Sequence, residues 1–487
     1  MGKFYITTAI DYVNDKPHLG HALEKIQADV LARYHRLKGD EVFFLTGTDE
    51  HGAKIVRAAQ KAGKDPQEFV NDISEKFQFL KDALNLSYDD FIRTSDKERH
   101  WPGAEKMWKA LREAGALYEK NYKGLYCVGH EAFITEKELV DGKCPDHGKE
   151  PEMVEEKNWF FKLSKYAKEI AEKIKSGELQ IIPEGRRNEI LSFLEGEVND
   201  VSFSRSIKNL EWGIPVPDDP EQVMYVWCDA LTSYISALGY GRNEDYKKWW
   251  PAGVQVLGKD ILRFHAAIWP AMLMAAKLPL PKQLFVHGFI TVDGKKMSKT
   301  IGNVVDPVEF IEKLVEKGVP RESAIDAFRY YLLREIPSTE DGDFSEEKFI
   351  ERYNADLANG LGNLVSRILQ MASQYLDKSI DVPNQKNIFD ISLGGVVRKR
   401  LDAFELDRAM FALWSWIKDS DRLIDEQKPF EAIKTNKQAA EKQLVYLLTD
   451  LAKIALVLRP FMPHTSEKII NAIVENKKPE NLFPRIS

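Results

Sequence analysis

Pro17-His18-Leu19-Gly20-His21 joins an apolar segment to an amphipathic one near the start of this chain. Residues 3–10 are rich in β-branched and aromatic side chains, which is typical of a buried strand. From residue 19 to residue 37, apolar residues recur at helical spacing. The two histidines therefore fall on the first turn of a helix, whose free N–H groups favour anions. The stretch indicates a phosphate-binding site, although a pair of capping or surface histidines is the commoner alternative for such a stretch alone.

The composition of the 487 residues is that of an ordinary globular protein, with 44% hydrophobic and 30% charged residues. No apolar run reaches the roughly 18 residues needed to cross a bilayer, and the N-terminus lacks the pattern of a signal peptide. Three cysteines do not make a disulfide framework in so long a chain. We therefore expect a cytoplasmic protein without membrane contact. The net charge of −7 argues against indiscriminate coating of nucleic acid, so RNA binding requires local basic patches.

A second apolar segment, residues 42–46, follows the predicted helix and runs into the polar cluster Gly47-Thr48-Asp49-Glu50-His51-Gly52. A strand, a crossover helix and a second strand make a βαβ unit, which predicts a parallel sheet covered by helices. Ligands of such sheets gather at the carboxyl ends of the strands, so both polar clusters are expected at one edge. Further strands of this sheet are predicted at residues 223–227, 253–257 and 284–292.

The predicted fold class is α/β: a Rossmann-like parallel-sheet domain, split by an insertion and followed by an all-α bundle. Around Gly115 the sequence changes to short strands and turns, and helices are predicted at 159–175 and 187–194. From residue 345 onward the apolar pattern is helical. The predicted division places the first half of the split domain at 1–114, the insertion at 115–222, the second half at 223–292, a loop region at 293–344 and the bundle at 345–487.

Cysteines and histidines of the predicted insertion form a metal-binding pattern. Two residues separate Cys127 from His130, two separate Cys144 from His147, and thirteen lie between the pairs. Two thiolates and two imidazoles at this spacing match a tetrahedral Zn²⁺ site. Four protein ligands leave no open position, so the sequence predicts one structural zinc ion per chain. The alternative is a coincidence of buried cysteines with surface histidines.

A basic loop follows the last predicted strand of the split sheet. Asp293-Gly294 is a tight-turn signal, and Lys295, Lys296 and Lys299 come directly after it. Such a run is usually a solvated turn. At the ligand-binding edge of the sheet, however, mobile lysines complement the negative charge of a phosphoryl-transfer transition state.

His18-Leu19-Gly20-His21 and Lys296-Met297-Ser298-Lys299-Thr300 resemble the two signature sequences of class I aminoacyl-tRNA synthetases, with Thr300 where serine is usual. Within this class the chain resembles the bacterial methionyl-tRNA synthetase family along nearly its whole length. The matching stretches include residues 44–52, 225–234, 258–265 and 285–306. The resemblance implies activation of L-methionine by ATP with Mg²⁺, release of pyrophosphate, and transfer of methionine to the 3′ end of tRNA(Met).

The resemblance also assigns residues to each substrate. His18, Gly20 and His21 contact the ATP phosphates, and Lys299 closes over the pyrophosphate with the help of Lys296. Gly258 and Asp260 match the stretch next to the adenosine ribose. In the methionine pocket, Asp49 holds the ammonium group and Arg205 lies on the carboxylate side. The remaining implied members of the pocket are Ile10, Tyr12, Trp227, Leu231, Tyr234, Ile261 and His265.

Two positions depart from the family pattern near these sites. Asp11 stands in the pocket loop where many relatives carry an uncharged residue. His130 stands where cysteine is the more usual zinc ligand, and histidine is able to replace it.

In the bundle, Asn363 and Arg367 lie four residues apart on one helical face and match the readers of the CAU anticodon. Their usual partner is a tryptophan; here it is Phe430, which keeps a stacking face and lacks the indole N–H. Some relatives append a tRNA-binding barrel that also makes the dimer. No counterpart follows the bundle in this sequence, so we expect a monomer.

Two alternatives have distinct sequence signatures. The leucine, isoleucine and valine enzymes carry a much larger editing insertion, and the cysteine enzyme places zinc in its amino-acid pocket. The size of the predicted insertion, together with Trp227 and His265, favours methionine. A non-catalytic, tRNA-binding paralogue on the same fold has no reason to retain the signature histidines and lysines, which are all present here.

Overall fold

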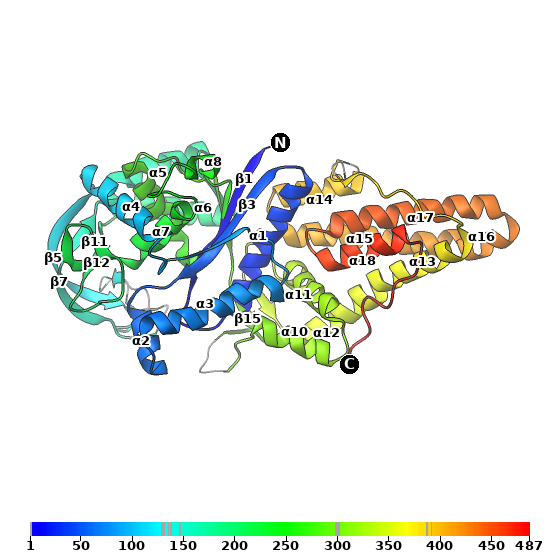
Figure 1. The fold of residues 1–487 in the computed structure, drawn as a ribbon, viewed down its shortest axis with the longest axis horizontal. Coiled ribbons are helices and arrows are strands. Elements are labelled where there is room, and N and C mark those ends of the chain that lie inside the picture. The colour runs from blue at the N-terminus through cyan, green and yellow to red at the C-terminus, as the bar shows by residue number, and fades with distance from the viewer. Residues whose placement is uncertain are drawn as a thin grey trace.

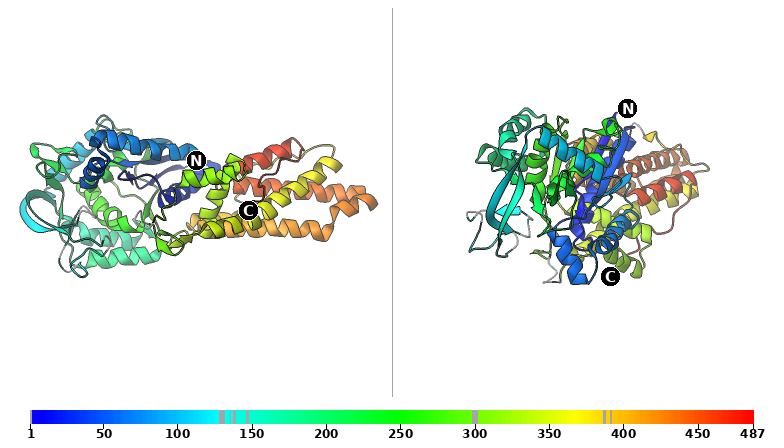
Figure 2. Two further views of the ribbon diagram at one scale, coloured as in Figure 1. Left: turned by 90° about the horizontal axis from the view of Figure 1, so that it is seen from below. Right: turned by 60° about the vertical axis from the view of Figure 1, so that its left-hand side comes forward.

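The computed structural model is elongated, with an α/β part at one end and a helix bundle at the other (Figures 1 and 2). The structure describes residues 2–127, 132–134, 136, 139–145, 148–297, 302–385, 388–390 and 392–487. The predicted fold class is confirmed: a parallel sheet is followed by a C-terminal region that is almost wholly helical.

The central sheet is parallel and has the strand order β2-β3-β1-β13-β14-β8, with β4 paired to β3. Its strands are β1 (Lys3–Thr8), β2 (Asp11–Tyr12), β3 (Glu41–Asp49), β4 (Asp90–Arg93), β8 (Gln180–Ile182), β13 (Val254–Gly258) and β14 (Gln283–His287). The chain passes from β1 through helix α1 (Leu19–Leu37) into β3, so the predicted βαβ unit is present. The carboxyl ends of β1 and β3 consequently bring the two polar clusters to the same edge.

Both faces of this sheet are buried, because neighbouring residues of β1 enter different apolar cores. Ile6 lies in the core that contains α1 and continues into the bundle, whereas Tyr5 lies in the core on the opposite face. That second core includes residues of α4 (Trp101–Glu113), α5 (Leu163–Ser176), α7 (Val226–Ser236) and α9 (Trp269–Ala275). The remaining helices of the α/β part are α2 (Ala53–Ala62), α3 (Pro66–Ala83), α6 (Glu184–Glu195) and α8 (Tyr246–Trp249).

The predicted insertion is only partly separate from the central sheet. Its antiparallel part comprises β5 (Leu117–Cys127), β6 (Ala132–Ile134), β7 (Glu152–Phe161) and β9 (Val201–Ser202), and a smaller sheet holds β10 (Ser204–Ser206), β11 (Pro215–Val216) and β12 (Asp219–Met224). Strand β8, however, lies between them in sequence and pairs with β14 of the central sheet. We therefore propose that residues 163–195, which form α5, β8 and α6, belong to the split domain.

Three predicted elements were wrong in type or extent. Residues 223–227 do not form a parallel strand, because β12 pairs antiparallel with β10 and α7 begins at Val226. The segment 284–292 is two strands, β14 and β15 (Ile290–Val292), which belong to different sheets. The helix predicted at 159–175 starts only at Leu163, since the preceding aromatic residues close β7. Short apolar runs do not distinguish a strand from a buried helix turn.

Between the sheet and the bundle, β15 forms a hairpin with β16 (Lys295–Lys296) and also pairs with β17 (Gly342–Phe344). Asp293 and Gly294 both have positive φ (50° and 72°), as a tight hairpin turn requires. Helix α10 (Pro307–Glu316) follows Asp306, whose side chain caps it by accepting the N–H groups of Val308 and Glu309. Helix α11 (Arg321–Glu335) follows and packs against α1, α15 and α18.

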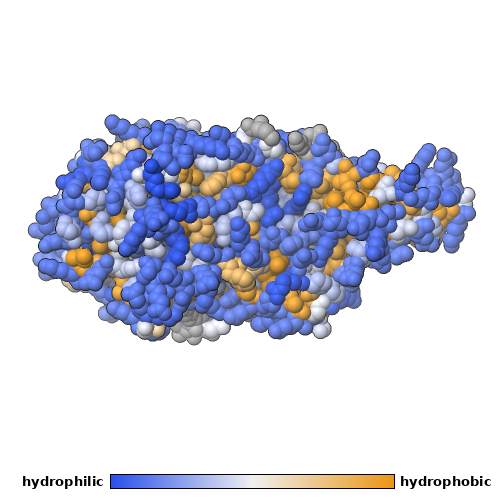
Figure 3. Space-filling view, in the orientation of Figure 1, coloured by the Kyte–Doolittle hydropathy of each residue, from blue (hydrophilic) through white to orange (hydrophobic). Residues whose placement is uncertain are grey.

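The bundle contains α12 (Glu346–Arg352), a π-helical segment η4 (Tyr353–Gly362), α13 (Asn363–Tyr375), α14 (Ser392–Asp402), α15 (Leu406–Gln427), α16 (Pro429–Thr435), α17 (Lys437–Leu458) and α18 (Pro463–Val474). Helix α16 lies at the end of the molecule that is farthest from the sheet (Figure 1). The face of the molecule in Figure 3 is mostly hydrophilic, with separate apolar patches. None of the described helices is both long and apolar enough to span a membrane.

Candidate active site

The N-terminus of α1 is capped by the two histidines of the first motif. His18 is the N-cap residue, and its Nδ1 accepts the backbone N–H of Gly20 at 3.1 Å. The Nδ1 of His21 accepts the backbone N–H of His18, also at 3.1 Å. The rings stack with their centroids 3.9 Å apart. The capping alternative is therefore correct for this structure, yet it uses only one nitrogen of each ring.

The protonation of these two rings follows from the capping bonds. Burial lowers the pKa of His18 and lowers the pKa of His21 well below its usual range. Both imidazoles are thus neutral at pH 7, and an Nδ1 that accepts a hydrogen bond leaves the proton on Nε2. Each ring consequently offers one Nε2–H donor beside the positive end of the α1 dipole. An anion such as a phosphate group fits this arrangement.

The segment that follows the second motif reaches the same helix terminus. Lys296 ends β16, and its Nζ lies 5.8 Å from the ring centroid of Phe289. Beyond the lysine loop, the carbonyl of Val305 accepts the backbone N–H of Leu19 at 3.2 Å. Lys16 forms ion pairs with Asp306 and Glu309 at 3.1 and 2.8 Å. The structure therefore joins the residues that follow the lysine loop to the start of α1, whereas Lys299 lies outside the described residues.

The two residues matched to the adenosine side, Gly258 and Asp260, lie at the end of β13, beside the end of β14. Gly258 ends β13, and a Cβ at this position would lie 2.8 Å from Oδ1 of Asp260, so a larger residue would displace that carboxylate. Burial raises the pKa of Asp260. His287 ends β14, and its Nε2 lies 3.1 Å from Oε2 of Glu24 on α1. Although burial opposes it, this contact with Glu24 raises the pKa of His287.

Glu24 and His287 were missed by sequence reasoning. Glu24 is 7% exposed and His287 is 6% exposed, so both are buried polar groups in the body of the site. The one available signal was position, because Glu24 follows His21 by three residues and His287 ends a predicted strand. Neither observation reveals that the two side chains meet.

The predicted methionine pocket is built mainly from one face of α7. Trp227, Leu231 and Tyr234 recur at helical spacing, so they share this face. Trp227 stacks on Phe264 with centroids 3.8 Å apart and meets the edge of His265 at 6.1 Å. Ile261 comes shortly before Phe264 and His265 in the chain, in a 3₁₀ turn, η2 (Lys259–Ile261), which follows β13. The structure thus brings Trp227 and His265 together, whereas their binding of methionine stays a prediction.

His265 is fixed by hydrogen bonds at both ring nitrogens. Its Nδ1 lies 3.0 Å from the carbonyl of Ile261, which requires a proton on Nδ1, so Nε2 accepts from the Tyr234 hydroxyl at 2.7 Å. The Tyr234 oxygen also makes a backbone hydrogen bond with Ile10. Burial lowers the pKa of His265 to about 4. In this state both ring nitrogens of His265 are engaged, so the ring has no N–H left to donate to a ligand of the pocket.

Replacing His265 with glutamine is expected to change how stability depends on pH. The folded-state pKa of His265, about 4, lies below the unfolded value near 6.5, so as the pH falls between these values only the unfolded chain gains a proton. The free energy of unfolding of the unaltered protein should therefore fall, relative to His265→Gln, by up to about 1.4 kcal/mol per pH unit. Urea unfolding of both proteins at several pH values tests this. Parallel curves would contradict the neutral, buried state of His265.

Asp49 lies next to the pocket loop, because β2 pairs with the end of β3. Tyr12 is opposite Asp49 in this pairing, and the backbone N–H of Val13 donates to the Asp49 carbonyl at 3.2 Å. Asp11, the departure from the family pattern, forms a buried ion pair with Lys25 of α1. Burial raises the pKa of Asp11 to about 7. Asp11 thus connects the pocket loop to α1 rather than facing solvent at the pocket rim.

Arg205 is buried in β10, at 6% exposure. Its Nη1 donates to Ser202 Oγ at 2.8 Å and to the Ser204 carbonyl at 2.7 Å, and its guanidinium lies about 5 Å from the ring centroids of Tyr126 and Tyr225. Tyr225 is the N-cap of α7, so these contacts connect Arg205 to the pocket helix. A carboxylate contact for Arg205 stays a prediction.

The predicted zinc ligands are only partly described. Cys127 and Cys144 are buried, reduced, and members of one small apolar cluster with Ile134. A tight turn follows Cys144, whose carbonyl accepts the N–H of Gly148 at 2.8 Å. His130 and His147 lie outside the described residues, and within the described part of the chain no three potential ligands gather. The zinc site therefore stays a prediction.

The predicted anticodon residues lie in the bundle, away from the sheet. Asn363 and Arg367 are on α13, and Phe430 is on α16 with 41% of its surface exposed. Arg367 forms ion pairs with Asp421 and Asp425 of α15 at 2.6 and 2.5 Å. Asn363 is exposed and Arg367 is half-buried, so both are accessible to a ligand of the bundle.

A parallel sheet with two Nε2–H donors at a helix N-terminus, together with the two signature sequences, agrees with a class I aminoacyl-tRNA synthetase. The family model described as tRNA synthetases class I (M) matches residues 4–150 and 138–369. The chain belongs to this family, which is also shown by its relatives.

Methionine–tRNA ligases of two bacteria illustrate the relationship. The enzyme of Thermotoga maritima is 42% identical over 98% of this chain and 76% of its own length. The enzyme of Brucella suis is 41% identical over 97% of this chain and 92% of its own. Among solved structures, Mycobacterium tuberculosis methionyl-tRNA synthetase in complex with methionyl-adenylate is similar over the whole of both chains, with a TM-score of 0.89 and 37% identity. The apo form of that enzyme gives 0.82 and 35% identity.

Proposed function

We propose that this protein is a methionine–tRNA ligase, which activates L-methionine with ATP and transfers it to tRNA(Met). The observation that supports this most directly is the N-terminus of α1, where His18 and His21 each present an Nε2–H donor and where Leu19 bonds to Val305, shortly after the lysine loop. The arrangement supplies positioning and charge stabilisation, which is most of what phosphoryl and nucleotidyl transfer require.

In the first step, a carboxylate oxygen of methionine attacks the α-phosphorus of ATP, and the bond between the α-phosphorus and the bridging oxygen to the β-phosphate breaks. Pyrophosphate leaves with that electron pair, as its Mg²⁺ complex. His18 and His21 donate to phosphate oxygens as negative charge develops there, and Lys296 and Lys299 neutralise the pyrophosphate. Gly20 and Gly258 allow close approach of the nucleotide, and Asp260 accepts from the ribose.

In the second step, a hydroxyl of the terminal tRNA ribose attacks the carbonyl carbon of the adenylate. The bond from that carbon to the phosphate oxygen breaks, AMP leaves with that electron pair, and its phosphate takes up the proton of the attacking hydroxyl. Asn363, Arg367 and Phe430 recognise the anticodon at the other end of the molecule. In this proposal the protein works as a cytoplasmic monomer.

Selection of methionine rests on the pocket walls. A flexible, polarizable thioether suits a pocket of aromatic and aliphatic side chains, which here include Trp227, Leu231 and Ile261. Asp49 would pair with the substrate ammonium. Because His265 is neutral and bound to Tyr234, the pocket carries no charge from this ring that would favour an ionic side chain.

Pyrophosphate exchange with a panel of amino acids tests the function. We expect exchange that depends on methionine and not on leucine, isoleucine or cysteine. Exchange with one of the other amino acids would indicate another class I synthetase. Absence of exchange with every amino acid, combined with tight binding of tRNA, would favour the non-catalytic paralogue.

One structural zinc ion per chain, held by Cys127, His130, Cys144 and His147, is part of this proposal. Two buried cysteines in one small cluster, neither of them in a disulfide, suit such an ion. Metal analysis should give about one zinc per chain, and Cys144→Ser should lose the metal. The matched control is Cys228→Ser in α7, which removes the third cysteine and should retain it. A folded protein free of metal would contradict the four ligands.

A further inference from the structure

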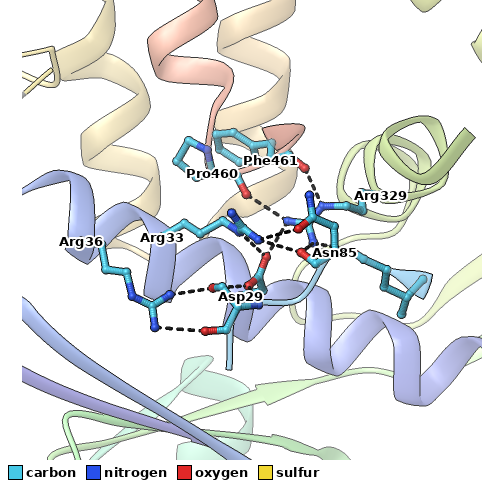
Figure 4. Close-up of polar contacts among 9 residues, drawn as sticks. Asp29, Arg33, Arg36, Asn85, Arg329, Pro460 and Phe461 are labelled. Atoms are coloured by element: carbon cyan, nitrogen blue, oxygen red, sulfur yellow. Dashed lines mark hydrogen bonds and ion pairs between the residues drawn. The ribbon is translucent and has the colours of Figure 1, made fainter. Parts of the chain in front are cut away.

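Arg329, on α11, is fully buried and uses every N–H group of its guanidinium. Its Nε donates to the Phe461 carbonyl at 2.9 Å, and one Nη2 bond of 3.0 Å reaches the Pro460 carbonyl. Nη1 donates to the carbonyls of Leu84 and Asn85, at 3.1 and 3.4 Å. The remaining Nη2 proton is donated to Oδ2 of Asp29 at 2.8 Å (Figure 4). Five bonds from one side chain therefore join four separate segments.

Asp29 is the partner of Arg329 in the α/β part of the molecule, and the contacts around these two side chains are called the joint below. It lies on α1, eight residues beyond His21, and is fully buried. Its Oδ1 accepts the N–H and the hydroxyl of Ser87 at 2.7 and 2.6 Å, while Oδ2 accepts from Arg33 and Arg329. The carboxylate thus has four hydrogen bonds. Such a fully satisfied buried network holds its members in a single arrangement.

On the bundle side, α11 contacts the turn between α17 and α18. Pro460 and Phe461 belong to this turn, where the C-terminal end of α17 carries partial negative charge and the Arg329 cation meets it. Asp326 precedes Arg329 by three residues, and its Oδ2 accepts the N–H of Thr465, in the first turn of α18, at 2.6 Å. One face of α11 therefore supplies a cation to one helix end and an anion to the other.

Two helices lead away from this joint to the two functional ends of the molecule. Helix α17 has 22 residues, about 33 Å at 1.5 Å per residue, and begins next to α16 with Phe430. Helix α1 runs back from Asp29 to His21 and His18. A second bond, from the Tyr34 hydroxyl of α1 to Asp402 of α14 at 2.6 Å, also crosses between the two parts. The apolar core is continuous across the same boundary.

We propose that Arg329 is a positioning residue for tRNA charging, because it fixes the direction of the bundle relative to α1. This inference rests on the proposed function. A rotation of about 5° at the joint moves the far end of a helix about 33 Å long by about 3 Å, whereas misplacement of about 1 Å is able to slow a reaction 10²-fold. A tRNA that binds both ends at once requires this direction to be held. Methionine activation, which involves only the α/β part, does not.

Arg329→Lys tests the proposal, because lysine keeps the charge near Asp29 but lacks the planar fork that bonds three other segments at once. We expect methionine-dependent pyrophosphate exchange to stay within about twofold and kcat/KM for tRNA to fall about 10–100-fold. The matched control is Arg33→Lys. Arg33 contacts the same Asp29 and the same Asn85, at 2.7 Å each, through bonds that stay within the α/β part. This control should leave both reactions within about twofold.

A double-mutant cycle with Arg367→Ala separates positioning from general destabilisation. If Arg329 acts through the bundle, Arg329→Lys should cost little more once the anticodon contact is already lost. The same cycle is measured with Asp326→Asn, a milder change of the same face of α11, which keeps the test decisive if Arg329→Lys does not fold. Equal losses in both backgrounds, loss of exchange in a folded variant, or unchanged charging by both variants would overturn the proposal. Lack of exchange in the unaltered protein would instead contradict the proposed function.

Discussion

His21→Asn is expected to fold normally and to catalyse methionine-dependent pyrophosphate exchange about 10²–10³ times more slowly, the usual cost of losing one donor to developing charge. The amide oxygen of asparagine takes the place of Nδ1, so it still accepts the N–H of His18 and keeps the α1 terminus capped. The donor at the position of Nε2 is what the variant lacks. The loss should appear in kcat, because the bond strengthens as charge develops on the phosphates.

His21→Gln is the matched control, since it keeps the donor and loses the acceptor, which is the opposite of His21→Asn. Its amide nitrogen takes the place of Nε2 and is able to donate, while no acceptor remains at Nδ1. We expect this variant to keep its rate within about tenfold of the unaltered protein and to lose about 0.5–2 kcal/mol of the free energy of unfolding with the cap. If the variant that keeps the cap, His21→Asn, were fast and the variant that keeps the donor, His21→Gln, were slow, this would contradict a phosphate-binding role for Nε2–H.

Local sequence was sufficient to predict the elements on which the site rests. The periodicity after Leu19 and the apolar run before it are properties of adjacent residues, and the observed bounds of β1 and α1 agree with them. The strand–helix–strand order then required a parallel pair, so the position of the first two polar clusters followed from chirality and topology alone. The helix that carries Trp227 and Tyr234 was not predicted in this way, because residues 223–227 were expected to form a strand, and only the family resemblance grouped the two residues.

Long-range pairing was not accessible in this way. Strand β8 is three residues long and its place beside β14 depends on a partner about a hundred residues away, so its local sequence resembles any short strand of the insertion. The meeting of Glu24 with His287, and of Asp29 with Arg329, joins residues about 260 and 300 positions apart. Charged residues are seldom buried without a partner, but a single sequence shows neither which of them are buried nor which residues they pair with.

Arg367→Ala is expected to lower kcat/KM for tRNA charging about 10–100-fold while leaving pyrophosphate exchange unchanged, since one good contact to a base edge contributes about 1–3 kcal/mol. Arg367 is bonded to Asp421 and Asp425, which hold its guanidinium in one orientation before tRNA arrives. Both carboxylates are partly exposed, so removing their partner should cost little stability. The loss should therefore measure recognition rather than folding.

Arg422→Ala provides the matched control for charge, because it removes one cation from α15, the helix that carries both aspartates. Arg422 is largely exposed and pairs with Asp419 and Glu426 on its own helix. Non-specific attraction to phosphates depends on cations of either kind and weakens with salt, so an equal loss in both variants would reduce Arg367 to a general electrostatic contact. A residue that reads bases should give a different result. The loss should be confined to Arg367→Ala and persist at higher salt, and it should disappear with a tRNA of altered anticodon. Pyrophosphate exchange requires only the α/β part. If Arg367→Ala lowered exchange as much as tRNA charging, the bundle would affect both reactions, which contradicts a role for Arg367 in tRNA recognition alone.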